Sequence, residues 1–237
     1  MEKKPAKKKN IKSVLISTKV KGFLKNPIKE DPLKFYMSHY HNSKTAFVVA
    51  KFEDLSLQSE DYSTLLEQRY LSNFLIEFVI NLILKDDVAK EYQLIISEVG
   101  TSIFCLQNSS YINLFNILSS SKYIIIPINV NSNHWCIIFL ELEKKKFFFC
   151  DPMTNSASNS KYFNIFLKLK LPGINIFDWR EESVKHNIQT DDFNCGIYII
   201  YFCYQFVKYR KIFDEKTFEP NAYRQNLLSF TRFAPEM

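Results

Sequence analysis

One cysteine stands where a polar loop gives way to a long apolar run. In the stretch "TDDFNCGIYIIYFC", acceptor-rich residues at 191, 192 and 194 precede Cys195, and the aliphatic and aromatic residues after it have the spacing of a buried helix. This pattern predicts Cys195 at a helix N-terminus, where the helix dipole and the free backbone N–H groups favour a thiolate. Cys195 is therefore either a packing residue that starts the helix or a nucleophile.

A histidine and an aspartate flank a predicted hairpin earlier in the chain. The segment "HWCIIFLELEKKKFFFCD" alternates two apolar runs with a charged turn, which we place around Leu142 and Glu143. An antiparallel pair centred there puts His134 opposite Asp151, with Cβ atoms roughly 5 Å apart. The hairpin therefore predicts an imidazole against a carboxylate at the end of a sheet.

These residue types together suit nucleophilic catalysis. A thiolate attacks a carbonyl, an imidazole takes and returns the proton, and a carboxylate orients the ring, which are the roles of Cys195, His134 and Asp151. The backbone N–H of Cys195 and the side-chain amide of Gln189, six positions earlier, could stabilise an oxyanion. At the next position, Gly196 would let a substrate backbone approach closely.

The elements that position these residues follow from hydrophobic periodicity. Apolar residues recur at helical spacing from residue 71 to 84, with Ser72 or Asn73 as N-cap. The runs 122–130, 134–142 and 146–151 are β-branched and aromatic, as strands are. A helical segment over 161–171, a strand candidate at 174–179 and the helix after Cys195 follow. A helix, a sheet and a long helix predict an α+β domain.

At these residues the sequence resembles the ubiquitin-like-protein-specific cysteine proteases, the family of the deSUMOylating and deneddylating enzymes. That family has His-Trp opening a strand, an aspartate seventeen positions later and Gln-x5-Cys-Gly opening a helix. The matching residues here are His134 with Trp135, Asp151, and Gln189 with Cys195 and Gly196. The segments "YLSNFLIEF" and "KYIIIPINVNSNHW" are similar to two further family segments, so the likeness covers roughly residues 45 to 210.

The resemblance implies a papain-like α+β fold with a central mixed sheet flanked by helices, and cleavage after the C-terminal Gly-Gly of a ubiquitin-like modifier, SUMO or the neddylation modifier. In that family two aromatic rings close over the diglycine, which makes Trp135 and Tyr70 the matching substrate-binding pair. The layout resembles the small deneddylases more than the large SUMO proteases. It implies a Cys-His-Asp thiol protease that acts on precursors or conjugates.

Two departures from the family pattern keep other functions open. Tyr70 stands where the family has tryptophan, and Asn194 stands where it has aspartate before the cysteine. We expect Asn194 still to cap the helix. The alternatives are a catalytically weak member that only binds a modifier, and an acyltransferase or deubiquitinase on the same fold.

The charge of the chain is concentrated at its start. Residues 1–34 hold eleven lysines against three acidic residues, whereas the remaining residues hold 20 basic against 22 acidic side chains. We therefore expect a basic, flexible N-terminal segment at 1–40, a catalytic domain at 41–237, and no nucleic-acid surface on that domain. The modifier and its conjugates are the expected partners of a monomer that binds no membrane.

Cysteine and histidine usage bears on compartment and cofactors. Five cysteines, an odd number, mostly lie in apolar runs, which favours an intracellular reducing compartment, nucleus or cytoplasm. We expect no cofactor and no metal: Cys150 would point away from His134 and Cys136, and there is no CxxC pair. His186 is expected in a surface or loop position, and Trp179 in packing.

Overall fold

The computed structural model describes residues 48–52, 55–66, 68–85, 91–108, 121–154, 161–169 and 178–232. All of them belong to the unit Thr45–Met237. The predicted basic segment 1–40 lies outside the described residues, so its boundary with the catalytic domain stays a prediction.

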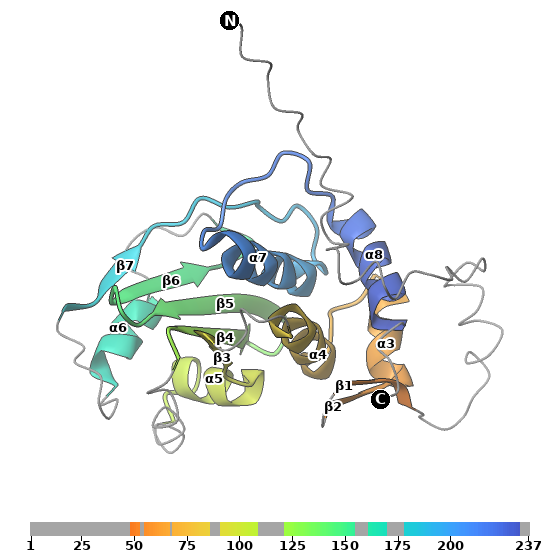
Figure 1. Ribbon diagram of the computed structural model, residues 1–237, viewed down its shortest axis with the longest axis horizontal. Coiled ribbons are helices and arrows are strands. Elements are labelled where there is room, and N and C mark those ends of the chain that lie inside the picture. Colours follow the sequence, from red (N-terminus) through yellow and green to blue (C-terminus); the bar gives the residue numbers. More distant parts are fainter. Residues whose placement is uncertain are drawn as a thin grey trace, which may run out of the picture. The chain divides into compact units, whose positions relative to one another are not determined.

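A five-stranded mixed sheet forms the centre of the described structure (Figure 1). Its strands, in spatial order, are β3 (Tyr92–Leu94), β4 (Tyr123–Val130), β5 (His134–Glu141), β6 (Lys146–Cys150) and β7 (Arg180–Glu182). The two central pairings, β4 with β5 and β5 with β6, are antiparallel, and the outer strands β3 and β7 pair in parallel. The three central strands are those that the β-branched and aromatic runs predict. The strand candidate at 174–179 falls mainly outside the described residues.

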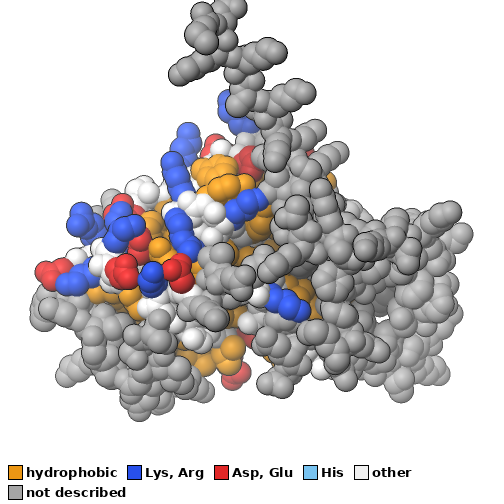
Figure 2. All heavy atoms as spheres, in the orientation of Figure 1, with side chains coloured by type: hydrophobic (Ala, Val, Ile, Leu, Met, Phe, Trp, Pro, Cys, Tyr) orange, Lys and Arg blue, Asp and Glu red, His pale blue; other side chains and the backbone are white. Residues whose placement is uncertain are grey.

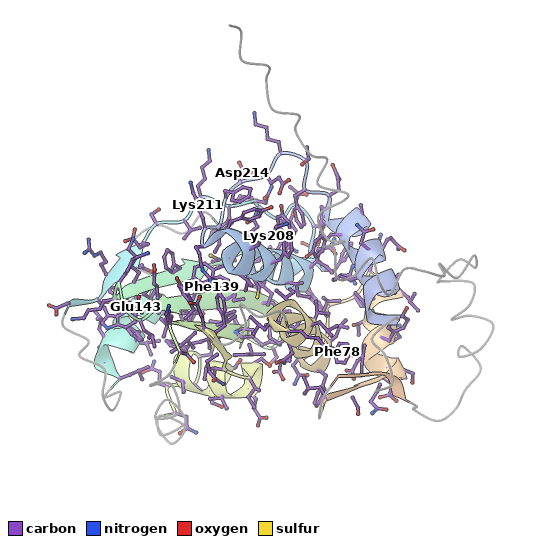
Figure 3. All side chains as sticks on the ribbon, in the orientation of Figure 1. Phe78, Phe139, Glu143, Lys208, Lys211 and Asp214 are labelled. Atoms are coloured by element: carbon purple, nitrogen blue, oxygen red, sulfur yellow. The ribbon has the colours of Figure 1, made fainter. Side chains whose placement is uncertain are left out.

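Helices cover both faces of this sheet because alternate side chains of its central strands are apolar on both sides. In Figure 1, α7 (Cys195–Tyr209) crosses one face, and α5 (Ser97–Phe104) and α6 (Lys161–Lys168) lie on the other. On the α7 face, Phe139 of β5 stacks on Phe206, with ring centroids 4.4 Å apart. Figure 3 labels Phe139 on the sheet. On the opposite face, Trp179 packs edge-on against Phe166 at 4.8 Å, which confirms its expected packing role.

The predicted helix over 71–84 is α4 (Asn73–Leu84), and it begins where the sequence indicates. The Ser72 hydroxyl accepts a hydrogen bond from the Leu75 N–H at 3.2 Å, so Ser72 is the N-cap. The remaining described elements are β1 (Val48–Phe52), β2 (Leu55–Gln58), α3 (Ser59–Leu66) and α8 (Pro220–Arg232). Strands β1 and β2 form a separate antiparallel pair. The Tyr62 hydroxyl of α3 donates to the Leu228 carbonyl of α8 at 3.1 Å, which joins these two helices.

Surface charge on the described part of the chain is mixed in sign. Figure 2 shows basic and acidic side chains interspersed on the visible face. Two ion pairs join the β5–β6 turn and β6 to β7 and the segment just before it. Lys145 pairs with Asp178 at 2.6 Å, and Lys146 pairs with Glu182 at 2.9 Å. Among the described helices, none has the length and the apolar content that crossing a bilayer requires.

Candidate active site

His134 and Asp151 meet at the end of the β5–β6 hairpin, but through a different register from the predicted one. His134 Nε2 and Asp151 Oδ1 lie 2.7 Å apart. Glu141 pairs with Lys146, so the turn occupies 142–145 and its centre lies one residue beyond the predicted position. Lys145 takes a left-handed conformation there, with φ 52°. The prediction that His134 lies directly opposite Asp151 was therefore wrong, because the imidazole reaches the carboxylate along the diagonal of the pair.

The electrostatics of this pair favour an imidazolium against a carboxylate. Burial alone would lower the pKa of His134, but hydrogen bonds from its ring to Asp151, Cys136 and Cys195 raise it above its ordinary value. Burial alone would raise the pKa of Asp151, but hydrogen bonds from His134 and from the Met153 N–H hold it below its ordinary value. Asp151 Oδ1 accepts the Met153 N–H bond at 2.9 Å. Each partner thus stabilises the charged form of the other.

Cys195 is the first residue of α7 and is fully buried. Its thiol contributes to the raised pKa of His134, so Cys195 lies near the His134–Asp151 pair. The Cys136 thiol lies within 4.8 Å of a nitrogen of the same ring. Burial raises the pKa of Cys136 to about 12, so this second thiol stays protonated.

Asn194 does not cap α7, which corrects the prediction from the sequence. The residue has φ −90° and ψ 6°, and its side chain makes no hydrogen bond to the first turn of the helix. Its Nδ2 donates instead to Asp191 Oδ2 at 2.9 Å, and its Oδ1 accepts from Arg224 Nε at 3.0 Å. Both ends of the amide thus bond to Asp191 and Arg224 rather than to the first turn of α7.

Gln189 lies beside Asp191 in the loop that leads to Cys195. Its Nε2 donates to the Asp191 carbonyl at 2.6 Å and to Asp191 Oδ1 at 3.2 Å. Its backbone N–H donates to the Pro152 carbonyl at 2.7 Å, which ties this loop to the end of the hairpin. Gln189 therefore lies between the His134–Asp151 pair and the loop before Cys195. Its expected role as an oxyanion donor stays a prediction.

The predicted substrate-binding residues lie around Leu71. Trp135 is only 3% exposed, and its indole N–H donates to the Leu71 carbonyl at 3.0 Å. Tyr70, the preceding residue, is 46% exposed. A Cβ on Gly196 would lie 3.0 Å from the Cβ and Cγ of Leu71, so the structure gives this glycine a close packing neighbour. Contact of Trp135, Tyr70 and Gly196 with a substrate stays a prediction.

The site also contains a set of groups that could ligate a metal ion. His134, Cys136 and Asp151 offer atoms that all lie within 4.8 Å of one another. Cys150 is not in this set; it pairs with Ile137, which places it on the other face of the sheet. His134 and Asp151 already satisfy one another in a hydrogen bond, so this geometry also suits an orienting pair without an ion.

Three residues in or beside the site carry interactions that sequence reasoning missed. Asp191 accepts hydrogen bonds from its own loop, and Arg224 reaches that loop from α8, 30 positions beyond Asn194. Neither Asp191 nor Arg224 belongs to a recognisable sequence motif. The weak signals available were one of several loop aspartates and an arginine on a polar helix. His186 does lie in a loop, but it is buried against Phe202, with ring centroids 4.7 Å apart.

Comparison with known proteins identifies a matching family. Residues 115–225, just under half of the chain, match the model of the Ulp1 protease family, C-terminal catalytic domain. The matched segment contains His134, Asp151, Gln189 and Cys195. No curated protein matches the chain in sequence.

Solved structures share the fold at low sequence identity. The yeast Ulp1 protease domain in complex with Smt3, the yeast ortholog of SUMO, matches with TM-score 0.71 and 17% identity, over 88% of this chain and 97% of that one. The Ulp1-like SUMO protease catalytic domain of Chaetomium thermophilum matches with TM-score 0.65 and 15% identity, over 87% and 90%. The effector XopD of Xanthomonas campestris bound to ubiquitin matches with TM-score 0.50 and 14% identity, over 68% and 91%.

The predicted fold class is thus confirmed as α+β with a mixed sheet flanked by helices. The family resemblance is confirmed as well: residues 115–225 match the Ulp1 protease family, and the chain has the fold of that family's catalytic domains.

Proposed function

We propose that the chain is a thiol protease or isopeptidase that cleaves after the C-terminal Gly-Gly of a ubiquitin-like modifier. The observation that carries this proposal is the position of the His134 ring. It lies 2.7 Å from an Asp151 carboxylate oxygen and near the Cys195 thiol at the start of α7, which helps to raise the pKa of His134. A nucleophile, a base and an orienting carboxylate in this order meet the requirements for acyl transfer.

The roles of the three residues follow from these contacts. The Cys195 sulfur attacks the carbonyl of the terminal glycine, and His134 delivers a proton to the departing amine. Water then attacks the thioester while His134 removes its proton, which releases the modifier with a free carboxylate. Asp151 holds the ring in one orientation and stabilises its charged form.

The oxyanion of each tetrahedral intermediate requires donors on the Cys195 side. The backbone N–H of Cys195 is at the free N-terminal end of α7, so it is available. The Gln189 amide is the second donor, and in the substrate complex one of its N–H groups would exchange Asp191 for the oxyanion. This exchange weakens one 3.2 Å hydrogen bond and leaves the shorter bond to the Asp191 carbonyl in place.

SUMO and the neddylation modifier are the proposed substrates, as precursors or conjugates. The exposed Tyr70 is available to pack on an extended tail, and the buried Trp135 anchors the backbone beside it. Support comes from the fold shared with a Ulp1 domain in complex with Smt3 and with XopD bound to ubiquitin. All five cysteines are free thiols, which fits an intracellular reducing compartment, nucleus or cytoplasm.

Adduct formation tests the nucleophile and the substrate together. SUMO, the neddylation modifier and ubiquitin, each carrying a C-terminal thiol-reactive group, would be incubated with the folded protein and the products weighed by mass spectrometry. We expect one modifier mass to be added to the wild type and to Cys105→Ala, which changes a thiol outside the site. We expect no addition to Cys195→Ala.

Each outcome has a definite meaning. An adduct with one probe, lost in Cys195→Ala, identifies both the nucleophile and the modifier class. An adduct that persists in Cys195→Ala assigns the chemistry to another thiol and refutes the triad. Binding of a modifier without an adduct would favour the alternative of a modifier-binding protein. Transfer of an acetyl group from acetyl-CoA to Cys195 would favour the acyltransferase.

A further inference from the structure

Arg224 is a buried cation whose guanidinium bonds to three separate segments of the chain. It is 4% exposed on α8. Its Nη1 donates to the Thr64 carbonyl in α3 at 2.6 Å, and its Nη2 donates to the Arg69 carbonyl at 3.1 Å. Its Nε donates to Asn194 Oδ1 at 3.0 Å, in the residue before α7. One planar fork of donors therefore joins α3, the segment that leads to α4, and the start of α7.

Asn194 links this cation to a carboxylate. Its Nδ2 donates to Asp191 Oδ2 at 2.9 Å and to Asn221 Oδ1 at 3.1 Å, while its Oδ1 accepts from Arg224. An aspartate at position 194 could accept from Arg224, but it has no N–H to donate to Asp191. A neutral amide is therefore the side chain that fits between this cation and this anion, which accounts for the asparagine before Cys195.

The Asp191 carboxylate extends these hydrogen bonds along the nucleophile loop, residues 189–194, which leads to Cys195. Its Oδ1 accepts from the backbone N–H of Phe193 at 3.0 Å and of Asn194 at 2.8 Å. The same oxygen accepts from Gln189 Nε2 at 3.2 Å. These bonds outweigh burial and hold the pKa of Asp191 below its ordinary value, so it is a carboxylate at neutral pH. We refer to Arg224, Asn194 and Asp191 together as the Arg224 relay.

We propose that the Arg224 relay is a positioning device for the modifier's C-terminal tail. At one end it holds the Arg69 carbonyl, next to Tyr70, and at the other it holds the loop that carries Gln189 and Cys195. It thereby sets the separation between the residue that packs on the tail and the groups that attack and stabilise its carbonyl. Arg224 acts through other residues, so it is a positioning residue. This inference rests on the proposed function for its substrate.

Arg224→Lys tests the geometry of the relay without removing its charge. A lysine offers one ammonium group, which cannot replace a planar fork that bonds to Thr64, Arg69 and Asn194 at once. Since misplacement of a reacting group by about 1 Å can cost about 100-fold, we expect kcat/KM for a modifier–fluorophore substrate to fall roughly 10- to 100-fold. Alkylation of Cys195 by iodoacetamide needs no bound tail, so we expect its rate not to fall in this variant.

The matched control is Arg210→Lys, at the opposite end of α7. Arg210 pairs with Glu91 at 2.7 Å on the surface and is the C-cap residue of the helix. We expect this variant to have the kcat/KM and the alkylation rate of the wild type. Equal losses in the two variants would show that any loss of an arginine on this fold reduces activity, and would overturn the proposal.

Amide hydrogen exchange tests the relay without any substrate. In Arg224→Lys we expect faster exchange at both 68–72 and 190–196, because the relay holds these two segments, with unchanged exchange in the central strands. Exchange equal to that of the wild type at both segments overturns the proposal. Faster exchange throughout the described structure also overturns it, because it shows a general loss of stability.

A charge transposition tests the donor and acceptor pattern. Asn194→Asp places two carboxylates side by side, and we expect kcat/KM to fall at least about tenfold. In the double variant Asp191→Asn with Asn194→Asp, the new amide at position 191 donates to the new carboxylate at position 194. That carboxylate can still accept from Arg224. We expect it to recover to within about threefold of the wild type, and recovery no better than that of the single variants counts against the relay.

The proposed function and the relay fail in different ways. If the wild type forms no adduct with any modifier probe, the proposed function fails, and the relay is judged on hydrogen exchange alone. If the wild type cleaves a modifier but Arg224→Lys retains full kcat/KM, the proposed function stands and the relay has no positioning role.

Discussion

At the scale of single residues, His134 is the point where the interactions of the site converge. Its ring bonds to Asp151, and Asp151, Cys136 and Cys195 all raise its pKa. The Cys136 thiol differs from the other two partners, because it lies in an apolar cluster and stays protonated. Of these partners, the Asp151 carboxylate is the charged one, so we expect Asp151 to orient the His134 ring.

Removing the charge of Asp151 tests this orientation. Asp151→Asn keeps the size of the side chain but weakens the stabilisation of a charged His134 and permits the wrong tautomer. We expect kcat for the modifier substrate to fall roughly 100- to 10,000-fold, measured in steady-state assays. Asp178→Asn, which removes a surface pair with Lys145, serves as the matched control. A kcat of Asp151→Asn within a few-fold of the wild type excludes Asp151 as the orienting group.

The same pair makes stability depend on pH. Asp151 has a lowered pKa, so its contribution is present above about pH 4 and is lost as the pH falls through the native value. His134 has a raised pKa, so its contribution is complete below about pH 6.5 and declines above that value. We expect the difference in free energy of unfolding between the wild type and Asp151→Asn, measured by urea unfolding, to be largest between about pH 4 and about pH 6.5. An advantage that is independent of pH contradicts this linkage.

At the scale of elements, the start of α7 packs against the segment before α4. Gly196 has the Leu71 side chain as its neighbour, and the Leu71 backbone is held by the Trp135 indole. The helix therefore begins at close range to the residue that follows Tyr70. A close approach of this kind needs a residue without a side chain.

Gly196→Ala tests this close approach. The added methyl would lie 3.0 Å from Leu71, which is 2% exposed and cannot move into solvent. We expect the variant to lose about 1–3 kcal/mol of stability despite the better helix propensity of alanine, measured by urea unfolding. With Leu71→Ala added, the two effects should combine to less than their sum, because the smaller neighbour relieves the clash. A stability of Gly196→Ala at or above that of the wild type would show that Leu71 gives way.

At the scale of the whole described structure, an aromatic cluster joins α7 to the sheet. Phe206 stacks on Phe139 and meets Tyr123 and Phe148 edge-on, with ring centroids 5.8 and 5.6 Å apart. Cys195 is at the N-terminus of this same helix, eleven residues before Phe206. The packing that stabilises the fold therefore also sets the place of Cys195, the proposed nucleophile.

Truncation of this cluster measures its contribution. We expect Phe206→Ala to cost about 3–5 kcal/mol in the free energy of unfolding, because a large buried ring leaves a cavity between α7 and β5. Phe74→Ala is the matched control: its ring is 58% exposed on α4, and we expect a change within about 0.5 kcal/mol. Similar costs for the two substitutions would show that α7 is not held by this cluster.

The sequence by itself determined the central elements and the candidate site of Cys195, His134 and Asp151. The β-branched runs predicted the three central strands, and the polar-to-apolar change at Cys195 predicted the start of α7, since short-range periodicity reports burial directly. The meeting of His134 with Asp151 was predicted because a hairpin brings its two ends together whatever the length of its turn. The exact register was not, because the left-handed residue Lys145 in a four-residue turn shifts the pairing.

Only the tertiary structure decided what surrounds these residues. Asn194 has the composition of a helix cap, but Arg224 and Asp191 compete for its amide and occupy both ends of it. Trp135 is buried, and its indole N–H is satisfied there by the Leu71 carbonyl, 64 positions earlier in the chain. Such partners carry no local pattern: a hydrogen bond between distant segments depends on how the helices pack on the sheet, and periodicity along the chain records only which face each residue turns toward the core.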